Sequence, residues 1–271
     1  MQRIAAIYLA LVPFLAAAIG FGLGGVPDFV SVPVWIVHSL LMVWLFDRQS
    51  KAGGADNASW TLPAFLFFVP WVLFTLFAGF GPPPSSPELW LAAKTQQQWR
   101  YALLTAGTIL LSIGFSVFAG RLETSDKSSW EKTASVLIGI AAPLNILNML
   151  YWGFYLPVAF TDFANTSALP RPDWYLAIRA IFSAVGVLSV ALIFIATACA
   201  AMAMKNRGLL KKNTATAYVL VNLLAAASAF IPADWPAALA GAGYFVTIPA
   251  ISFIGPYLLG LDLISVRTGR G

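Results

Sequence analysis

The chain has 271 residues, of which 59% are hydrophobic and only 10% are charged. A soluble domain carries about a quarter of its residues as charged side chains, so this composition excludes an ordinary soluble protein and indicates an integral membrane protein. The net charge of +5 is explained by the basic residues that flank membrane spans, and we expect no nucleic-acid partner.

Few residues are available for metal or cofactor binding. The sequence has one histidine and one cysteine, too few for a disulfide, an iron–sulfur cluster, a haem held by two histidines or a three-histidine zinc site. It also lacks the GxSxG, HExxH and phosphate-binding-loop motifs of hydrolases. We therefore expect no metal and no resident cofactor, and the sequence favours binding over catalysis.

Eight hydrophobic spans are predicted, each long enough to cross a bilayer. The first four occupy residues 1–25, 29–46, 60–80 and 101–119. The first begins like a signal peptide, with a basic residue before an apolar core, but its apolar run is too long for one and we expect it to be retained. A polar linker at 49–59 and a proline-rich segment at 81–90 separate the later spans.

The last four spans occupy residues 134–158, 173–204, 215–231 and 235–263. The most highly charged connection, residues 121–132, is mixed in sign, which is typical of a solvated loop. Pro143 lies inside the fifth span and is expected to kink it or to leave a carbonyl free. The chain is therefore predicted to be an all-α, polytopic integral membrane protein of eight transmembrane helices, without a soluble domain.

The basic residues predict how these spans are oriented. If the N-terminus lies on one side, that side collects twelve of the 16 Lys and Arg residues. The other side holds Lys94, Arg100, Arg171 and Arg179. The positive-inside rule then places both termini in the cytoplasm, and we expect a multi-pass protein of the inner cell membrane.

A recurrent start signal predicts an internal repeat. Each even-numbered span is preceded by a proline, an acidic residue and an aromatic residue, and the acidic residues are Asp28, Glu88, Asp173 and Asp234. The first two are 60 residues apart and the last two are 61 apart. This spacing predicts two parallel four-helix halves, residues 1–122 and 123–271. The alternative is that any outward helix start attracts such residues.

The fifth span contains a polar and aromatic stripe within residues 143–157, PLNILNMLYWGFYLP. On a helix, a set of such side chains falls within about 120° of one another. They include Asn145, Asn148, Tyr151 and Trp152. Amide side chains are costly in hydrocarbon, so this stripe either forms hydrogen bonds between helices or lines a pathway for a ligand.

Two ionisable residues inside spans are further candidates for a site. Arg179 lies about two turns inside the sixth span. It either snorkels to the membrane surface or offers its guanidinium to a carboxylate, a phosphate or a quinone carbonyl. His38 is the only side chain within a span that changes its charge near neutral pH, and it is either a packing residue or a proton partner of the site.

These features predict a transport-type protein that handles a small, anionic or amphipathic ligand in an outward-facing polar cavity. The predicted lining residues are Asn145, Asn148, Tyr151, Trp152 and Arg179, with His38 as proton partner. Two alternatives stay open. One is a haem-free, quinone-binding membrane subunit with protein partners in a larger complex, and the other is a lipid-modifying membrane enzyme. In each case the lipid bilayer surrounds the chain.

Overall fold

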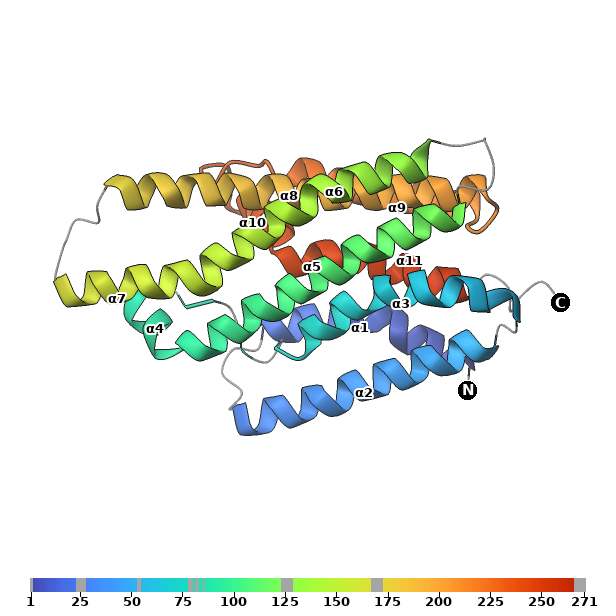
Figure 1. Ribbon diagram of the computed structural model, residues 1–271, viewed down its shortest axis with the longest axis horizontal. Coiled ribbons are helices and arrows are strands. Elements are labelled where there is room, and N and C mark those ends of the chain that lie inside the picture. Colours follow the sequence, from blue (N-terminus) through green and yellow to red (C-terminus); the bar gives the residue numbers. More distant parts are fainter. Residues whose placement is uncertain are drawn as a thin grey trace.

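The computed structural model describes residues 2–22, 28–52, 55–77, 80, 83–84, 86–122, 129–166 and 173–265. Within these ranges every regular element is a helix and no strand is present, so the chain is all-α. Figure 1 shows long helices lying side by side along the longest axis of the molecule.

The helical elements differ widely in length, and several follow one another without a loop. The first part of the chain forms α1 (Gln2–Gly22), α2 (Asp28–Ala52), α3 (Ala55–Thr75), the short α4 (Pro87–Ala92) and α5 (Lys94–Leu122). The second part forms α6 (Trp130–Leu150), the π-helical segment η2 (Tyr151–Tyr155), α7 (Leu156–Thr166), α8 (Asp173–Asn206), α9 (Lys212–Ser228), α10 (Ala237–Thr247), the 3-10 segment η3 (Pro249–Phe253) and α11 (Ile254–Ser265).

Several of these helices are long and apolar enough to cross a membrane. Among the described residues there are four, and they are Ala58–Thr75, Lys94–Leu122, Trp130–Phe163 and Trp174–Asn206. A fifth is formed if α10 and the segment 249–265, which meet at an angle of 66°, count as one broken span. Helices of this length and composition indicate a membrane protein.

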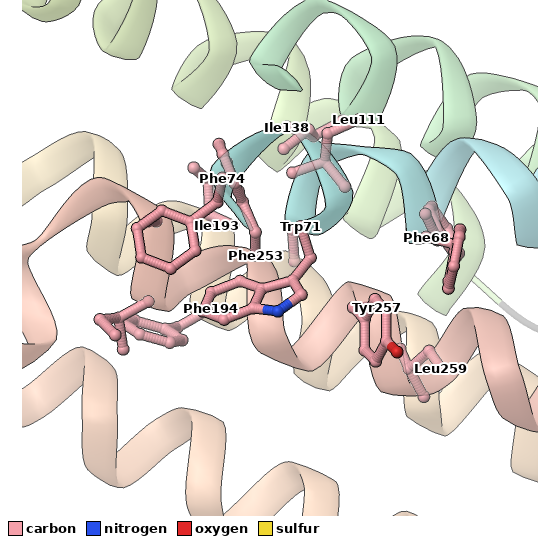
Figure 2. Packing of buried hydrophobic residues seen from close by; sticks show 14 of the residues in the cluster. Phe68, Trp71, Phe74, Leu111, Ile138, Ile193, Phe194, Phe253, Tyr257 and Leu259 are labelled. Atoms are coloured by element: carbon pink, nitrogen blue, oxygen red, sulfur yellow. The ribbon is translucent and has the colours of Figure 1, made fainter. Parts of the chain in front are cut away.

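Helix α3 lies at the centre of the packing. It contacts α2, α5 and α11, and its aromatic side chains enter a core shared with the C-terminal elements (Figure 2). Phe68 stacks on Tyr257 of α11 with ring centroids 5.1 Å apart. Trp71, Phe253 of η3 and Ile193 of α8 are fully buried in the same cluster. The first and second halves of the chain therefore share one hydrophobic core.

A glycine permits the close contact between α3 and α11. A Cβ atom at Gly260 would lie 2.7 Å from the carbonyl oxygen of Ala64 and 3.1 Å from Cβ of Phe67. Neither atom can rotate away, because one belongs to the backbone and the other is fixed to it. Small residues at such contacts are typical of helix pairs in membranes, where close packing drives association.

The fifth predicted span is helical throughout, and Pro143 does not interrupt it. Pro143 lies exposed on the outside of α6, which continues to Leu150. The irregularity comes later, where η2 inserts a wider π turn before α7. A π turn shifts the side chains that follow it around the helix, so it changes which residues of the polar stripe share a face.

The eighth predicted span, residues 235–263, is not one helix. α10 ends at Thr247, and Ile248 has an extended backbone with φ −65° and ψ 119°. Pro249 favours this break, because a proline ring disfavours the helical conformation of the residue before it. Proline alone does not impose it, since Pro33, Pro70 and Pro143 lie inside helices that continue. Pro249 itself is the first residue of η3. A backbone N–H at this position would have no acceptor within the helix, so the lack of an N–H in proline costs no hydrogen bond.

The acidic residues of the predicted repeat lie at or near helix starts. Asp28 and Asp173 are the first residues of α2 and α8. Glu88 lies in the first turn of the six-residue α4, and Asp234 lies shortly before α10 begins. The repeat and the division into two halves stay predictions.

We expect the Gly260→Ala variant to lose about 1–3 kcal/mol of stability, because the added methyl group overpacks the contact between α3 and α11. The matched control is Gly139→Ala on α6, where the added carbon meets open space. Thermal unfolding of the two purified variants measures the difference, with a lower melting temperature for Gly260→Ala only. Equal melting temperatures would contradict the close contact.

Candidate functional site

A cavity of about 590 Å³ is enclosed by α3, α4, α5, the end of α6 with η2, α8, and the joint between α10 and η3. This volume lies within the range of about 300–1,000 Å³ that is usual for small-molecule sites. The lining residues of α5 and α8 lie within their first four turns, so the cavity occupies the end of the bundle where these helices begin, at the left of Figure 1.

Three aromatic side chains form one side of the cavity, which we call the aromatic wall: Trp90 of α4, Tyr101 of α5 and Trp152 of η2. The ring centroids of Trp90 and Tyr101 are 6.3 Å apart, with the planes inclined by 19°. Those of Trp90 and Trp152 are 6.0 Å apart. These separations are within the 4.5–7 Å range of interacting rings, so the wall is one contiguous surface.

The short helix α4 holds Trp90 in this wall. Pro87 is its first residue, and the Ser86 hydroxyl caps it by accepting a hydrogen bond from the N–H of Leu89 at 3.3 Å. Trp90 is only 3% exposed, and its ring also meets the ring of Phe160 edge-on at 6.0 Å. Its indole N–H is buried without a hydrogen-bond partner among the described residues.

The π segment η2 brings Trp152 against α5. A Cβ atom at Gly153 would lie 2.6 Å from Cβ of Tyr101, so only glycine lets the two backbones approach this closely. The indole N–H of Trp152 donates to Oδ1 of Asn148, one turn earlier, at 3.1 Å. Single π turns within helices are frequent at functional sites, where they re-aim a side chain in this way.

Two arginine residues line the cavity from different helices. Arg100, in the second turn of α5, is 4% exposed, and its guanidinium carbon lies 5.9 Å from the ring centroid of Phe77. Arg179, in the second turn of α8, is exposed where the cavity reaches the surface. No carboxylate occurs among the described lining residues. The described walls therefore carry positive charge.

Arg100 is absent from the predicted site residues. A fourth span that begins at residue 101 leaves Arg100 outside the membrane, as one of the flanking basic residues. In the structure α5 begins at Lys94 instead, which turns Arg100 into an inward-facing residue of a continuous helix. The signal in the sequence is the stretch 94–100, KTQQQWR, which is rich in good helix formers.

The broken eighth span forms another wall of the cavity. Residues 247–250 all line the cavity. Around the break, the N–H of Ile248 donates to the carbonyl of Phe245 at 3.2 Å, and its carbonyl accepts from the N–H of Ile251 at 2.9 Å. Non-helical backbone at membrane depth is tolerated where it lines a cavity, and such interrupted helices form the binding sites of many transporters.

The structure brings three of the predicted residues to the cavity, namely Asn148, Trp152 and Arg179. Asn148 is buried against α8, where a Cβ atom at Gly186 would lie 2.8 Å from its Nδ2 atom. Gly186 thus makes room for the amide. The lining residues of α5, α6 and α8 lie close together because α6 packs against both α5 and α8.

Asn145 and Tyr151 lie outside the lining. Asn145 is fully buried, donates from Nδ2 to Oγ1 of Thr108 on α5 at 2.7 Å, and accepts from Oγ of Ser189 on α8 at 3.4 Å. It therefore joins three helices. The ring of Tyr151 stacks on Phe182 at 4.3 Å between centroids, behind the face that Phe182 turns to the cavity.

His38 lies away from the cavity. On α2, its Nδ1 atom is 2.8 Å from the hydroxyl of Tyr8 on α1, and its ring meets Trp35 edge-on at 5.3 Å. Neither α1 nor α2 contributes a described lining residue. The structure therefore does not bring His38 to the other predicted residues.

The chemistry that the described groups offer is binding. In the described ranges, no group of three or more His, Cys, Asp or Glu residues is placed to hold a metal ion. Two guanidinium groups and an amide provide hydrogen-bond donors, and aromatic rings provide flat apolar surface. These groups can hold and orient an anion that carries an apolar part.

We expect Asn145→Ala to lower stability by about 1 kcal/mol, the scale of hydrogen bonds between helices in membranes. A double-mutant cycle with Thr108→Val isolates the bond between the two side chains, and it should give a coupling of about 0.6–1.7 kcal/mol in thermal unfolding. The control pair is Asn145→Ala with Thr105→Val, because among the described residues the Thr105 hydroxyl donates only to the carbonyl of Tyr101, on its own helix. Coupling of equal size in both cycles would refute the three-helix role.

Comparison of the chain with protein-family models, with curated proteins and with solved structures finds no significant match.

Proposed function

We propose that this chain is a transport-type protein of eight membrane spans that binds a small, anionic and amphipathic ligand in the described cavity. The observation that carries the proposal is the pair of guanidinium groups, Arg100 and Arg179, on the walls of a cavity that is otherwise mainly aromatic and apolar. Charged residues within membrane segments are costly, and they usually mark a binding site or pathway.

Eight crossings are supported by the helices that are not among the five candidate spans. These are α1, α2 and α9. Residues 29–46 of α2 contain no charged side chain, and Ile4–Ala18 of α1 is apolar. In Figure 1, α1 begins and α11 ends toward the end of the bundle where α2–α3, α5–α6 and α8–α9 are joined, which fits an even number of crossings.

The orientation follows from the basic residues at these connections. Arg48 and Lys51 lie near the end of α2, Arg121 lies in the last turn of α5, Lys205 lies in the last turn of α8, and Arg207 follows α8. The positive-inside rule assigns that end to the cytoplasm, with both termini, in the inner membrane of the cell. The cavity, at the opposite end, then faces outward, where a ligand can enter from outside.

Transport rather than simple binding is supported by the interrupted helix at the site. Half-helices that meet at a ligand are a recurrent device of transporters, because their junction can bind a ligand and also change its angle. Here α10 and the segment 249–265 meet at 66° beside the cavity. A quinone-binding subunit would use the same aromatic surface but would not need two guanidinium groups on the walls.

We expect organic anions to raise the melting temperature of the purified protein in detergent micelles, because a ligand that binds only the folded state stabilises it. The shift should disappear in Arg100→Gln and persist in Arg121→Gln, a matched control that removes the same charge from the exposed last turn of the same helix. Uptake of the best-binding anion into proteoliposomes then tests transport. A panel of carboxylates, phosphates and sulfonates that all fail to stabilise the wild type would refute the proposal.

The topology is tested by cysteine labelling. The native Cys199 is buried and is first replaced by alanine. Single cysteines at the exposed positions Ala52 and Asn206 should react with a membrane-impermeant maleimide only after the cells are opened, and one at the exposed Ala92 should react in intact cells. The reverse pattern would overturn the orientation, and labelling at Ala52 and Ala92 from the same side would overturn the crossing by α3.

A further inference from the structure

We propose that the ligand of this cavity is an aromatic carboxylate, bound with its carboxylate on Arg100 and its ring against the aromatic wall. This inference rests on the proposed function, because it names the class of anion that the same site takes. It depends on two observations: the different burial of the two arginines and the composition of the wall.

The burial of the two guanidinium groups assigns them different roles. Arg100 is 4% exposed, so its attraction to an anion is weakly screened and a charge-assisted hydrogen bond there is strong. Its planar fork matches the two oxygens of a carboxylate. Arg179 is exposed at the mouth, where solvent screens a close contact but a positive charge still attracts anions into the opening. The carboxylate therefore binds at Arg100.

The wall beside Arg100 favours a ring over a flexible chain. Arg100 and Tyr101 are neighbours in α5 and both line the cavity, and Tyr101 continues into the surface formed with Trp90 and Trp152. A flat ligand ring gains edge and face contacts with such a surface in addition to its apolar burial. An alkyl group of the same size gains the burial alone.

Trp90 offers the ligand its ring face, and its indole N–H takes no part in binding. A buried indole N–H normally has a hydrogen-bond partner, because an unmet donor in an apolar surrounding is costly. The N–H of Trp90 has none among the described residues, although the side chain is 97% buried and lines the cavity. The Nε1 atom itself is closed off from the cavity, so the ligand meets the ring of Trp90 and not this N–H.

The test is calorimetric titration of the full chain in detergent micelles with three compounds of one carbon skeleton. They are 2-naphthoate, its neutral amide 2-naphthamide, and the saturated acid decahydro-2-naphthoate. We expect 2-naphthoate to bind at least about tenfold more tightly than the amide, because the charge-assisted bonds are lost. We expect it to bind about threefold to tenfold more tightly than the saturated acid, because the ring contacts are lost.

Variants separate the two parts of the site. Arg100→Gln should remove the preference for acid over amide and keep the preference for the aromatic skeleton. Trp90→Leu should do the opposite, and Trp90→Phe, which keeps a ring and is the milder change, should restore the aromatic preference. Trp174→Leu is the control, because Trp174 is an exposed tryptophan of α8 that does not line the cavity. Partition into micelles is the same for every variant and cancels in these comparisons.

The outcomes distinguish the inference from the proposed function. Equal binding of the aromatic and saturated acids, both above the amide, would overturn the aromatic carboxylate and leave an anion site intact. Tighter binding of the neutral quinone menadione than of 2-naphthoate would overturn the carboxylate and favour the quinone-binding alternative. Binding of organic anions of other classes, with none of the three compounds bound, would also overturn the inference alone. Failure of every anion would overturn both proposals.

Discussion

The break in the eighth span at Pro249 shapes the fold around the cavity. This proline disfavours the helical conformation at Ile248, and there the eighth span bends by 66° instead of crossing as one continuous helix. The two pieces then have different neighbours. α10 reaches toward α8 and α9, while η3 and α11 pack on α3. The space between these directions is where residues 247–250 meet the side chains of α5 and α8.

The polar stripe of the fifth span serves two structural purposes along its length. The amide of Asn145 forms hydrogen bonds to α5 and α8, and so it fixes the distance between three helices. Asn148, one turn later, reaches the cavity and orients the indole of Trp152. The two roles considered for the stripe are thus found in adjacent turns: Asn145 packs helices together, and Asn148 lines the cavity. The π segment after Asn148 contributes to this division by turning Tyr151 toward Phe182.

Two close contacts at glycine residues also help to position the site. Gly153 lets η2 lie against Tyr101, and Gly186 admits the amide of Asn148. Each of these contacts joins two different helices, and each is possible because glycine has no side chain. A rigid frame of this kind holds the aromatic wall and Arg100 in fixed relative positions. Pre-organised donors bind an anion with less loss of conformational entropy than mobile ones.

Composition and run length were sufficient to recognise an all-helical membrane protein, because burial in hydrocarbon demands long apolar helices whatever their neighbours are. The period of the helix also selected Asn148 and Trp152, and the depth of Arg179 within its span selected that residue, since both are properties of one helix. The break before Pro249 was not predicted, because the hydrophobic run has the length of one span and prolines elsewhere in the chain lie inside continuous helices.

Only the tertiary structure decided which helices meet. It joined Arg100 and Trp90 to the site, tied Asn145 to Thr108, and left His38 against Tyr8 on the first helix. A periodic pattern reports which side of a helix is polar but not which partner that side faces. The partner depends on contacts between segments far apart in the chain, and those contacts follow from side-chain shape and packing across the whole bundle.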